Sequence, residues 1–203
     1  MCEMCGCGVA KAGPRLAGAD AVTPTLAVSR LLWSLLRAWI CLRRGRMPPK
    51  AMPDPVWYFA YGSNMNERLF RERRHMTPLE SRLGRLEGHR LCFSVGGGMR
   101  PGVSAPANIV EAQGHTVYGV LYLLPLTKFA RLDASEGRQY AYLWTLVEDD
   151  TGARVPVVTY KMPWPAPEGR PGRRYFELIR EAARQRGLPA EYVALLDAVE
   201  TRE

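Results

Sequence analysis

The stretch Tyr58-Phe59-Ala60-Tyr61-Gly62-Ser63-Asn64 joins three local signals that predict the fold around it. The run from Val56 to Tyr61 is aromatic and β-prone, and a glycine ends it. The following residues, MNERLF from Met65, read as the first turns of a helix that runs to about His75. A strand, a glycine turn and a helix N-terminus leave several backbone N–H groups free in one concavity, which suits a carboxylate or a developing oxyanion.

The same stretch also has a plainer interpretation. Asn64 could cap the helix while Glu67 closes a capping box, which makes an ordinary strand-to-helix turn. Gly62 fits both interpretations, because a residue without Cβ either tightens a turn or lets a ligand approach the backbone. The local pattern leaves both open.

The distribution of charge argues against a nucleic-acid-binding protein. The 203-residue chain has a formal charge of +8. Residues 1–50 hold 8 basic and 2 acidic residues, a net of +6, whereas residues 51–203 hold 20 and 18, a net of +2. The larger part therefore lacks the clustered basic footprint of a nucleic-acid binder. Its arginine run, Arg68 to Arg74, is interleaved with glutamates and reads as a solvated helix face.

The cysteines predict a reducing, cytoplasmic setting rather than a disulfide scaffold. Only Cys92 of the five lies in the probable domain, and Cys41 stands alone before it. Cys2, Cys5 and Cys7 are close enough to hold a soft metal, but no second ligand pair follows at zinc-site spacing. We expect neither a metal nor a cofactor.

The first 50 residues have a different character from the rest. We expect residues 1–50 to be disordered or a non-native extension, with the domain at 55–203. Residues 26–44 are apolar but carry Arg30 and Arg37 on one helical face. They are too charged for a comfortable membrane span and could form an amphipathic helix on a membrane surface or a partner.

The remaining pattern predicts an α+β domain in which strands dominate. Expected helices cover 128–135 with Thr127 as the cap, 173–186 ended by Gly187, and 190–201. A loop should cover 163–171 and a flexible turn 96–98, and the expected strands are 56–61, 90–95, 107–111, 116–124, 141–148 and 154–160.

Four motifs in this order resemble the γ-glutamylcyclotransferase (AIG2-like) family. They span residues 56–200, essentially the whole domain, and residues 1–50 have no counterpart in the family. They are Tyr61-Gly62-Ser63-Asn64 after an aromatic strand; Val117-Tyr118-Gly119-Val120 followed by Leu132-Asp133-Ala134-Ser135-Glu136-Gly137; Tyr160 in a late strand; and Gly187-Leu188-Pro189-Ala190-Glu191-Tyr192 near the end.

The resemblance implies a small, mixed, barrel-like sheet flanked by helices. It implies intramolecular aminolysis of a γ-glutamyl amide, which yields 5-oxoproline and a free amine, as in glutathione metabolism. The family's acid–base glutamate falls on Glu136, and its substrate-binding residues fall on Tyr61, Gly62, Ser63 and Asn64, with Tyr160 in the late strand. No metal, cofactor or nucleic acid is implied, and the partner is a small γ-glutamyl molecule.

The chain departs from the family pattern at one tyrosine. Members closest to the animal enzymes have a tyrosine seven residues after the glutamate, where this chain has Leu143. A one-residue deletion brings Tyr142 into register, and we predict Tyr142 as a substrate-binding residue, with Tyr140 as the alternative. Removal of a γ-glutamyl protecting group in a biosynthetic pathway and a non-catalytic γ-glutamyl-binding module remain open as functions.

The position of Glu136 suits the chemistry. The substrate's α-amine must lose a proton before it attacks its own γ-carbonyl, and the leaving nitrogen must gain one. One carboxylate between the two nitrogens can do both. Glu136 follows an apolar helix and precedes Gly137, so the helix end and low-dielectric surroundings should raise its proton affinity.

Overall fold

The computed structural model describes residues 52–95, 103–137, 139–162 and 167–203. All of them belong to one compact unit, Leu35–Glu203; a second unit, Met1–Ser34, lies wholly outside the described residues. The same holds for the expected amphipathic helix at 26–44, the turn at 96–98 and, at the N-terminus, Cys2, Cys5, Cys7 and Cys41.

Five strands close into a barrel in the order β1-β3-β2-β4-β5. The strands are β1 (Val56–Ala60), β2 (Glu80–Phe93), β3 (Ala107–Leu124), β4 (Ala141–Asp149) and β5 (Arg154–Lys161). All neighbours pair antiparallel except β1 and β5, which are parallel, so the sheet is mixed. The predicted α+β fold with a barrel-like sheet is confirmed.

The two longest strands differ from the sequence prediction. The expected strands at 107–111 and 116–124 are one strand, β3, and its partner β2 begins at Glu80 rather than Arg90. Their register shifts between Glu87 and His89, where Gly88 has a φ of 70°. A glycine can take this left-handed conformation without strain, so the strand continues past the irregularity.

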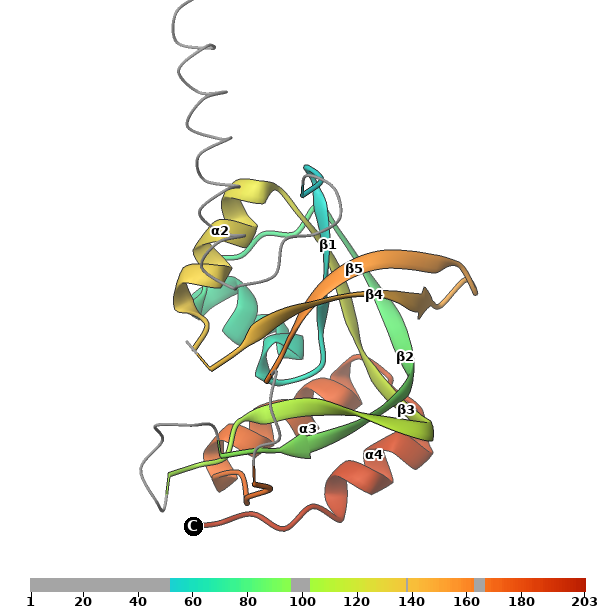
Figure 1. The fold of residues 1–203 in the computed structure, drawn as a ribbon. Helices are drawn as coiled ribbons and strands as arrows, with labels where there is room; N and C mark the ends of the chain where they lie inside the picture. Colours follow the sequence, from blue (N-terminus) through green and yellow to red (C-terminus); the bar gives the residue numbers. More distant parts are fainter. Residues whose placement is uncertain (1–51, 96–102, 138, 163–166) are drawn as a thin grey trace, which may run out of the picture. The chain divides into compact units, whose positions relative to one another are not determined.

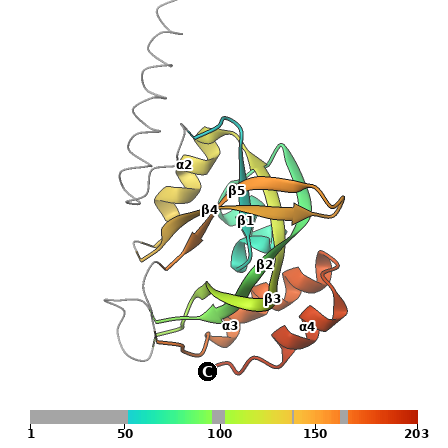
Figure 2. The ribbon, with the colours of Figure 1, turned by 45° about the vertical axis from the view of Figure 1, so that its right-hand side comes forward.

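In the described part of the chain, three α-helices flank the barrel: α2 (Leu126–Ser135), α3 (Arg173–Gln185) and α4 (Ala190–Asp197). Figures 1 and 2 show α3 and α4 side by side along one arm of β2 and β3, away from α2. The expected Thr127 cap is wrong. Instead, the Leu126 N–H donates to Oδ1 of Asp54 over 2.9 Å, so a residue before β1 caps α2.

The helix expected after the glycine turn is replaced by two short turns. Ser63–Met65 form a 3-10 turn and Leu69–Arg73 a short π-helix. The side chain that caps the second turn is Asn66, whose Oδ1 accepts from the Leu69 N–H over 3.0 Å. The interpretation of Asn64 as the cap is therefore wrong, and its side chain makes other hydrogen bonds instead.

An aromatic cluster packs α2 against strands β4 and β5. The buried rings of Phe129, Tyr142 and Tyr160 have centroids 5.7–6.2 Å apart. Gly119 of β3 lets β1 approach closely, because a Cβ there would lie 2.3 Å from the Ala60 carbonyl oxygen. Within the described ranges, no helix is long and apolar enough to cross a membrane.

Candidate active site

A small cavity of about 50 Å³ lies where the 61–64 loop meets the end of α2. It brings together six of the seven predicted residues: the four of the loop, Glu136 and Tyr160. Its full lining is Tyr58, Tyr61, Gly62, Ser63, Asn64, Arg74, Ala107, Glu136, Tyr140, Tyr160 and Tyr175.

The loop is held in place from behind by buried phenols. The Tyr122 hydroxyl donates to the Asn64 carbonyl oxygen over 3.2 Å and accepts from Nη2 of Arg186 over 3.1 Å. The Tyr61 hydroxyl donates to the Tyr160 carbonyl oxygen, which ties the loop to β5. Hydrogen bonds from buried side chains therefore fix the loop against the core.

Glu136 directly follows α2 and closes that helix with its own backbone. Its N–H donates to the carbonyl oxygens of Leu132 and Asp133 over 3.1 and 3.2 Å. Its side chain is 12% exposed. Oε1 accepts a hydrogen bond from Nδ2 of Asn64 over 3.1 Å and lies 3.3 Å from Nη1 of Arg74. The carboxylate is thus fixed on one oxygen by a neutral donor and a cation.

Asn64 links the loop to this carboxylate. Its Nδ2 also donates to the Tyr58 hydroxyl over 2.9 Å, and the residue is only 7% exposed. The assignment of the amide follows from its neighbour, because an ionised Glu136 can only accept. The Oδ1 atom of Asn64 is buried and has no hydrogen-bond partner among the described residues, so it is available to a ligand N–H.

The loop also offers backbone donors. The N–H groups of Gly62, Ser63 and Asn64 make no hydrogen bond with the described residues; the hydrogen bonds of this turn instead begin with the N–H of Met65. Gly62 has a φ of −112°, so its conformation does not require glycine. Its packing does constrain it, because a Cβ would lie 3.2 Å from Cβ of Ala107 and 3.6 Å from the Tyr175 hydroxyl.

Sequence reasoning missed Arg74. It placed this residue on a solvated face, and that description holds for Arg68 and Arg71, which pair with Glu72 and Glu67 at the surface. Arg74 instead follows the π-helix, and the wider turn of that helix takes the side chain out of the α-helical phase and toward Glu136. No signal in the local sequence distinguishes it from its neighbours.

The structure separates the two candidate tyrosines. Tyr140 lines the cavity and donates from its hydroxyl to the Ala107 carbonyl oxygen over 2.7 Å. Tyr142 is fully buried against Phe129 and does not line the cavity. The arrangement favours Tyr140 over the predicted Tyr142.

Tyr175, which no motif indicated, also lines the cavity and accepts from the Ala107 N–H over 3.0 Å.

The phenols of the cavity stay neutral at physiological pH. Burial raises the pKa of Tyr58, Tyr61 and Tyr160 well above the ordinary range, and the negative charge of Glu136 adds to the effect. Burial likewise raises the pKa of Tyr140 and Tyr175. These side chains can position a ligand but are poor bases, and Glu136 is the one carboxyl group in the lining.

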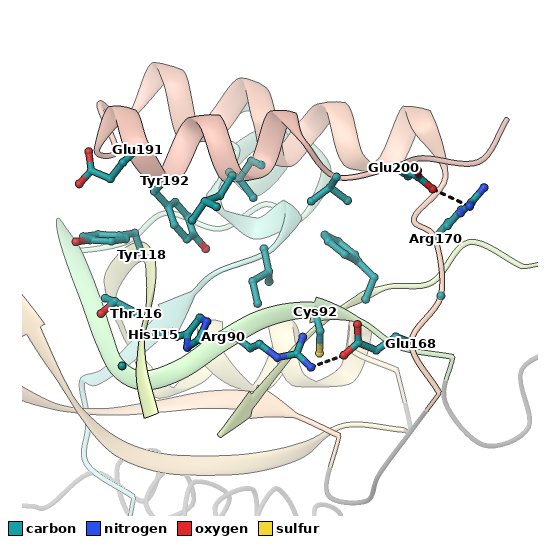
Figure 3. Close-up of a pocket in the computed structure, with 17 residues that line it drawn as sticks. Arg90, Cys92, His115, Thr116, Tyr118, Glu168, Arg170, Glu191, Tyr192 and Glu200 are labelled. Carbon is teal, nitrogen blue, oxygen red and sulfur yellow. Dashed lines mark hydrogen bonds and ion pairs between the residues drawn. The ribbon is translucent and has the colours of Figure 1, made fainter. Parts of the chain in front are cut away.

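A larger groove of about 620 Å³ lies elsewhere, between α4 and the β2–β3 arm (Figure 3). Its lining combines apolar side chains with the ion pairs Arg90–Glu168 and Arg170–Glu200. It shares no residue with the small cavity. The volume of a cavity therefore does not identify the reacting centre. We identify it instead by the carboxylate, the free N–H donors and the unpartnered amide oxygen that the small cavity brings together.

The chain is similar to known proteins in both sequence and fold. The model of the AIG2-like family matches residues 116–196. A γ-glutamyl cyclotransferase of Aspergillus oryzae, aclK, is 32% identical over 173 residues, which cover 72% of this chain and 63% of that protein. A solved γ-glutamyl cyclotransferase structure superposes with a TM-score of 0.64 at 26% identity, over 74% of this chain and 90% of the other.

In sequence and in fold the chain is similar to the γ-glutamylcyclotransferase (AIG2-like) family. A mammalian relative, the γ-glutamylcyclotransferase of Bos taurus, is 28% identical over 152 residues, or 72% of this chain and 79% of its own length. The chain thus spans somewhat less than two thirds of the fungal relative and more of the bovine one.

No group of three or more His, Cys, Asp or Glu side chains within the described residues could hold a metal ion.

Proposed function

We propose that this protein is a γ-glutamyl cyclotransferase that converts γ-glutamyl amino acids or amines to 5-oxoproline and a free amine. The observation that carries the proposal is the contact between the loop and the carboxylate, from Nδ2 of Asn64 to Oε1 of Glu136. It joins the one carboxyl group of the cavity to a loop with free donors. The names of its relatives support the same activity.

The reaction needs one new bond and one broken bond. The α-nitrogen attacks the γ-carbonyl carbon, and the electron pair of the C=O bond moves to the oxygen. When the carbonyl re-forms, the bond to the leaving nitrogen breaks. The α-ammonium ion gives up two protons in total and the leaving nitrogen gains two. In our proposal the Glu136 carboxylate carries one of them directly, and the other passes through solvent.

The remaining lining residues have positioning roles in this proposal. The N–H groups of Gly62, Ser63 and Asn64 would stabilise the oxyanion, at about 3 kcal/mol per well-placed donor. Oδ1 of Asn64 would accept from the attacking nitrogen, since it has no partner among the described residues. The neutral hydroxyls of Tyr58 and Tyr140 would orient the γ-glutamyl chain, so that ring closure benefits from a high effective molarity.

The test is a substrate panel. Purified protein is incubated with γ-glutamyl dipeptides and γ-glutamyl amines, and 5-oxoproline is measured, with α-glutamyl dipeptides as the matched negative control. Formation of 5-oxoproline from γ-glutamyl compounds alone is expected. Tight binding of these compounds without product would instead indicate a binding module.

A cytoplasmic setting is part of the proposal, and the free thiol of buried Cys92 supports it.

A further inference from the structure

We infer that Arg74 selects substrates whose leaving amine carries a carboxylate, so that γ-glutamyl amino acids are preferred to γ-glutamyl amines. The inference rests on the proposed cyclotransferase activity. It concerns the part of the cavity for which the sequence motifs supply no residue.

The guanidinium of Arg74 is anchored at the end of α2. Its Nη1 donates to Oγ of Ser135 over 2.6 Å and lies 3.3 Å from Oε1 of Glu136. The Ser135 hydroxyl in turn donates to the Leu132 carbonyl oxygen over 2.7 Å. The backbone is fixed too, because the Arg74 N–H donates to the Leu69 carbonyl oxygen over 3.1 Å. The position of the charge is therefore set before a substrate arrives.

Half of the guanidinium remains available. Both anchoring contacts use Nη1, and no partner of Nη2 or Nε occurs in the described part of the chain. These two nitrogens form one edge of the planar group, with the spacing that binds a carboxylate through two parallel hydrogen bonds. Arg74 is also the one cationic residue in the lining. A second anion can thus bind without loss of the contact to Glu136.

The burial of the lining indicates which carboxylate this is. Tyr58, Tyr61 and Tyr160 at the inner end are 3–6% exposed, while the Arg74 side chain is 24% exposed. The oxyanion donors of the loop hold the reacting carbonyl, and the leaving nitrogen must extend from it toward the open side. A cavity of 50 Å³ has room for about two waters, so a bulky leaving group must extend outward past Arg74.

The experiment compares two leaving groups in several variants. The substrates are γ-glutamylalanine and γ-glutamylalaninamide, which differ only in the leaving carboxylate. Because alanine and alaninamide differ in basicity, the measured quantity is the ratio of kcat/KM values, compared between variants. In the unmodified protein we expect a ratio of about tenfold to a hundredfold in favour of γ-glutamylalanine. In Arg74→Gln the ratio should fall by about tenfold to a hundredfold relative to the unmodified protein, chiefly through a higher KM for γ-glutamylalanine.

The neighbouring arginine provides the control. Arg73 is exposed and absent from the cavity lining, so Arg73→Gln removes the same charge one residue away and should keep the full ratio. Arg74→Lys keeps the charge without the planar fork and should keep only part of the ratio. Thermal unfolding of each variant establishes that it is folded.

The outcomes separate the two proposals. Absence of 5-oxoproline from both substrates contradicts the cyclotransferase function itself. Product formation without a preference in the unmodified protein overturns the inference about Arg74. An equal loss on both substrates in Arg74→Gln overturns it as well, because Arg74 would then only hold Glu136. A preference that follows the substrate's α-carboxylate, tested with the α-amide of γ-glutamylalanine, would assign Arg74 to the other carboxylate.

Discussion

The side-chain amide of Asn64 donates a hydrogen bond to Oε1 of Glu136 across 72 positions of sequence. Asn64 lies in the 3-10 turn after β1, and Glu136 directly follows α2. Each was indicated separately by a motif, but only the barrel brings them into contact. The functional unit is this pair, so substitutions on either side should affect the same step.

Asn64→Ala should lower kcat/KM by about tenfold to a hundredfold, because it removes a donor to an ionised group from a buried site. The loss should appear mainly in kcat if the amide orients Glu136 for proton transfer. Steady-state kinetics with a γ-glutamyl dipeptide measures this. A change confined to KM would mean that Asn64 only binds the substrate.

Glu136→Gln keeps the size of the side chain but cannot accept a proton. We expect turnover to fall by about a hundredfold to ten-thousandfold while substrate binding persists. Calorimetric titration with a slow substrate and an assay of 5-oxoproline measure the two quantities. Turnover close to that of the unmodified protein would contradict the role of Glu136.

Gly62→Val should impair binding and turnover together. A Cβ at this position already lies 3.2 Å from Cβ of Ala107, and the added methyl groups would crowd Ala107 and the nearby Tyr175 hydroxyl. A decrease in kcat/KM of at least about tenfold is expected, with Gly62→Ala much milder. Normal kinetics in a folded Gly62→Val variant would make the loop purely structural.

Asp149 should make the stability of the fold depend on acid. It accepts from Thr151, Ala153 and Arg82 at the β4–β5 turn, and these hydrogen bonds hold its pKa well below the ordinary value. A lowered pKa in the folded state stabilises the fold above about pH 4, and this contribution is lost as the pH falls below that value. Urea unfolding at pH 3 and pH 7 should differ less in Asp149→Asn than in the unmodified protein.

The boundary of the domain can be tested by truncation. We propose that a protein that begins at Met52 folds and is fully active, because the site residues all lie after it. One that begins at Val56 should be less stable, since it lacks the buried Met52 and the Asp54 cap of α2. Thermal unfolding compares the two. An inactive Met52 form would place the boundary earlier in the chain.

The sequence was sufficient for the fold class and for most of the cavity. Runs of β-prone residues predicted the strands, and ordered motifs predicted Glu136 and the 61–64 loop. Contacts between distant segments were not predictable from local patterns. The capping preference of asparagine favoured Asn64, but Asn66 is the residue with its side chain toward the free N–H of Leu69. Arg74 was missed because the period of a π-helix is not visible in a run of charged residues.

The tyrosines around the 61–64 loop give the molecule an alkaline limit. Burial raises the pKa of Tyr122 to about 12 and that of the other phenols further. Below about pH 10 the phenols are neutral in both the folded and the unfolded chain, so they do not make the free energy of unfolding depend on pH. Above it, only the unfolded chain can ionise them, and the free energy of unfolding must fall as the pH rises. The same aromatic shell that keeps Glu136 among neutral donors thus makes the protein intolerant of strong base, and tyrosinate absorbance would appear together with the loss of structure.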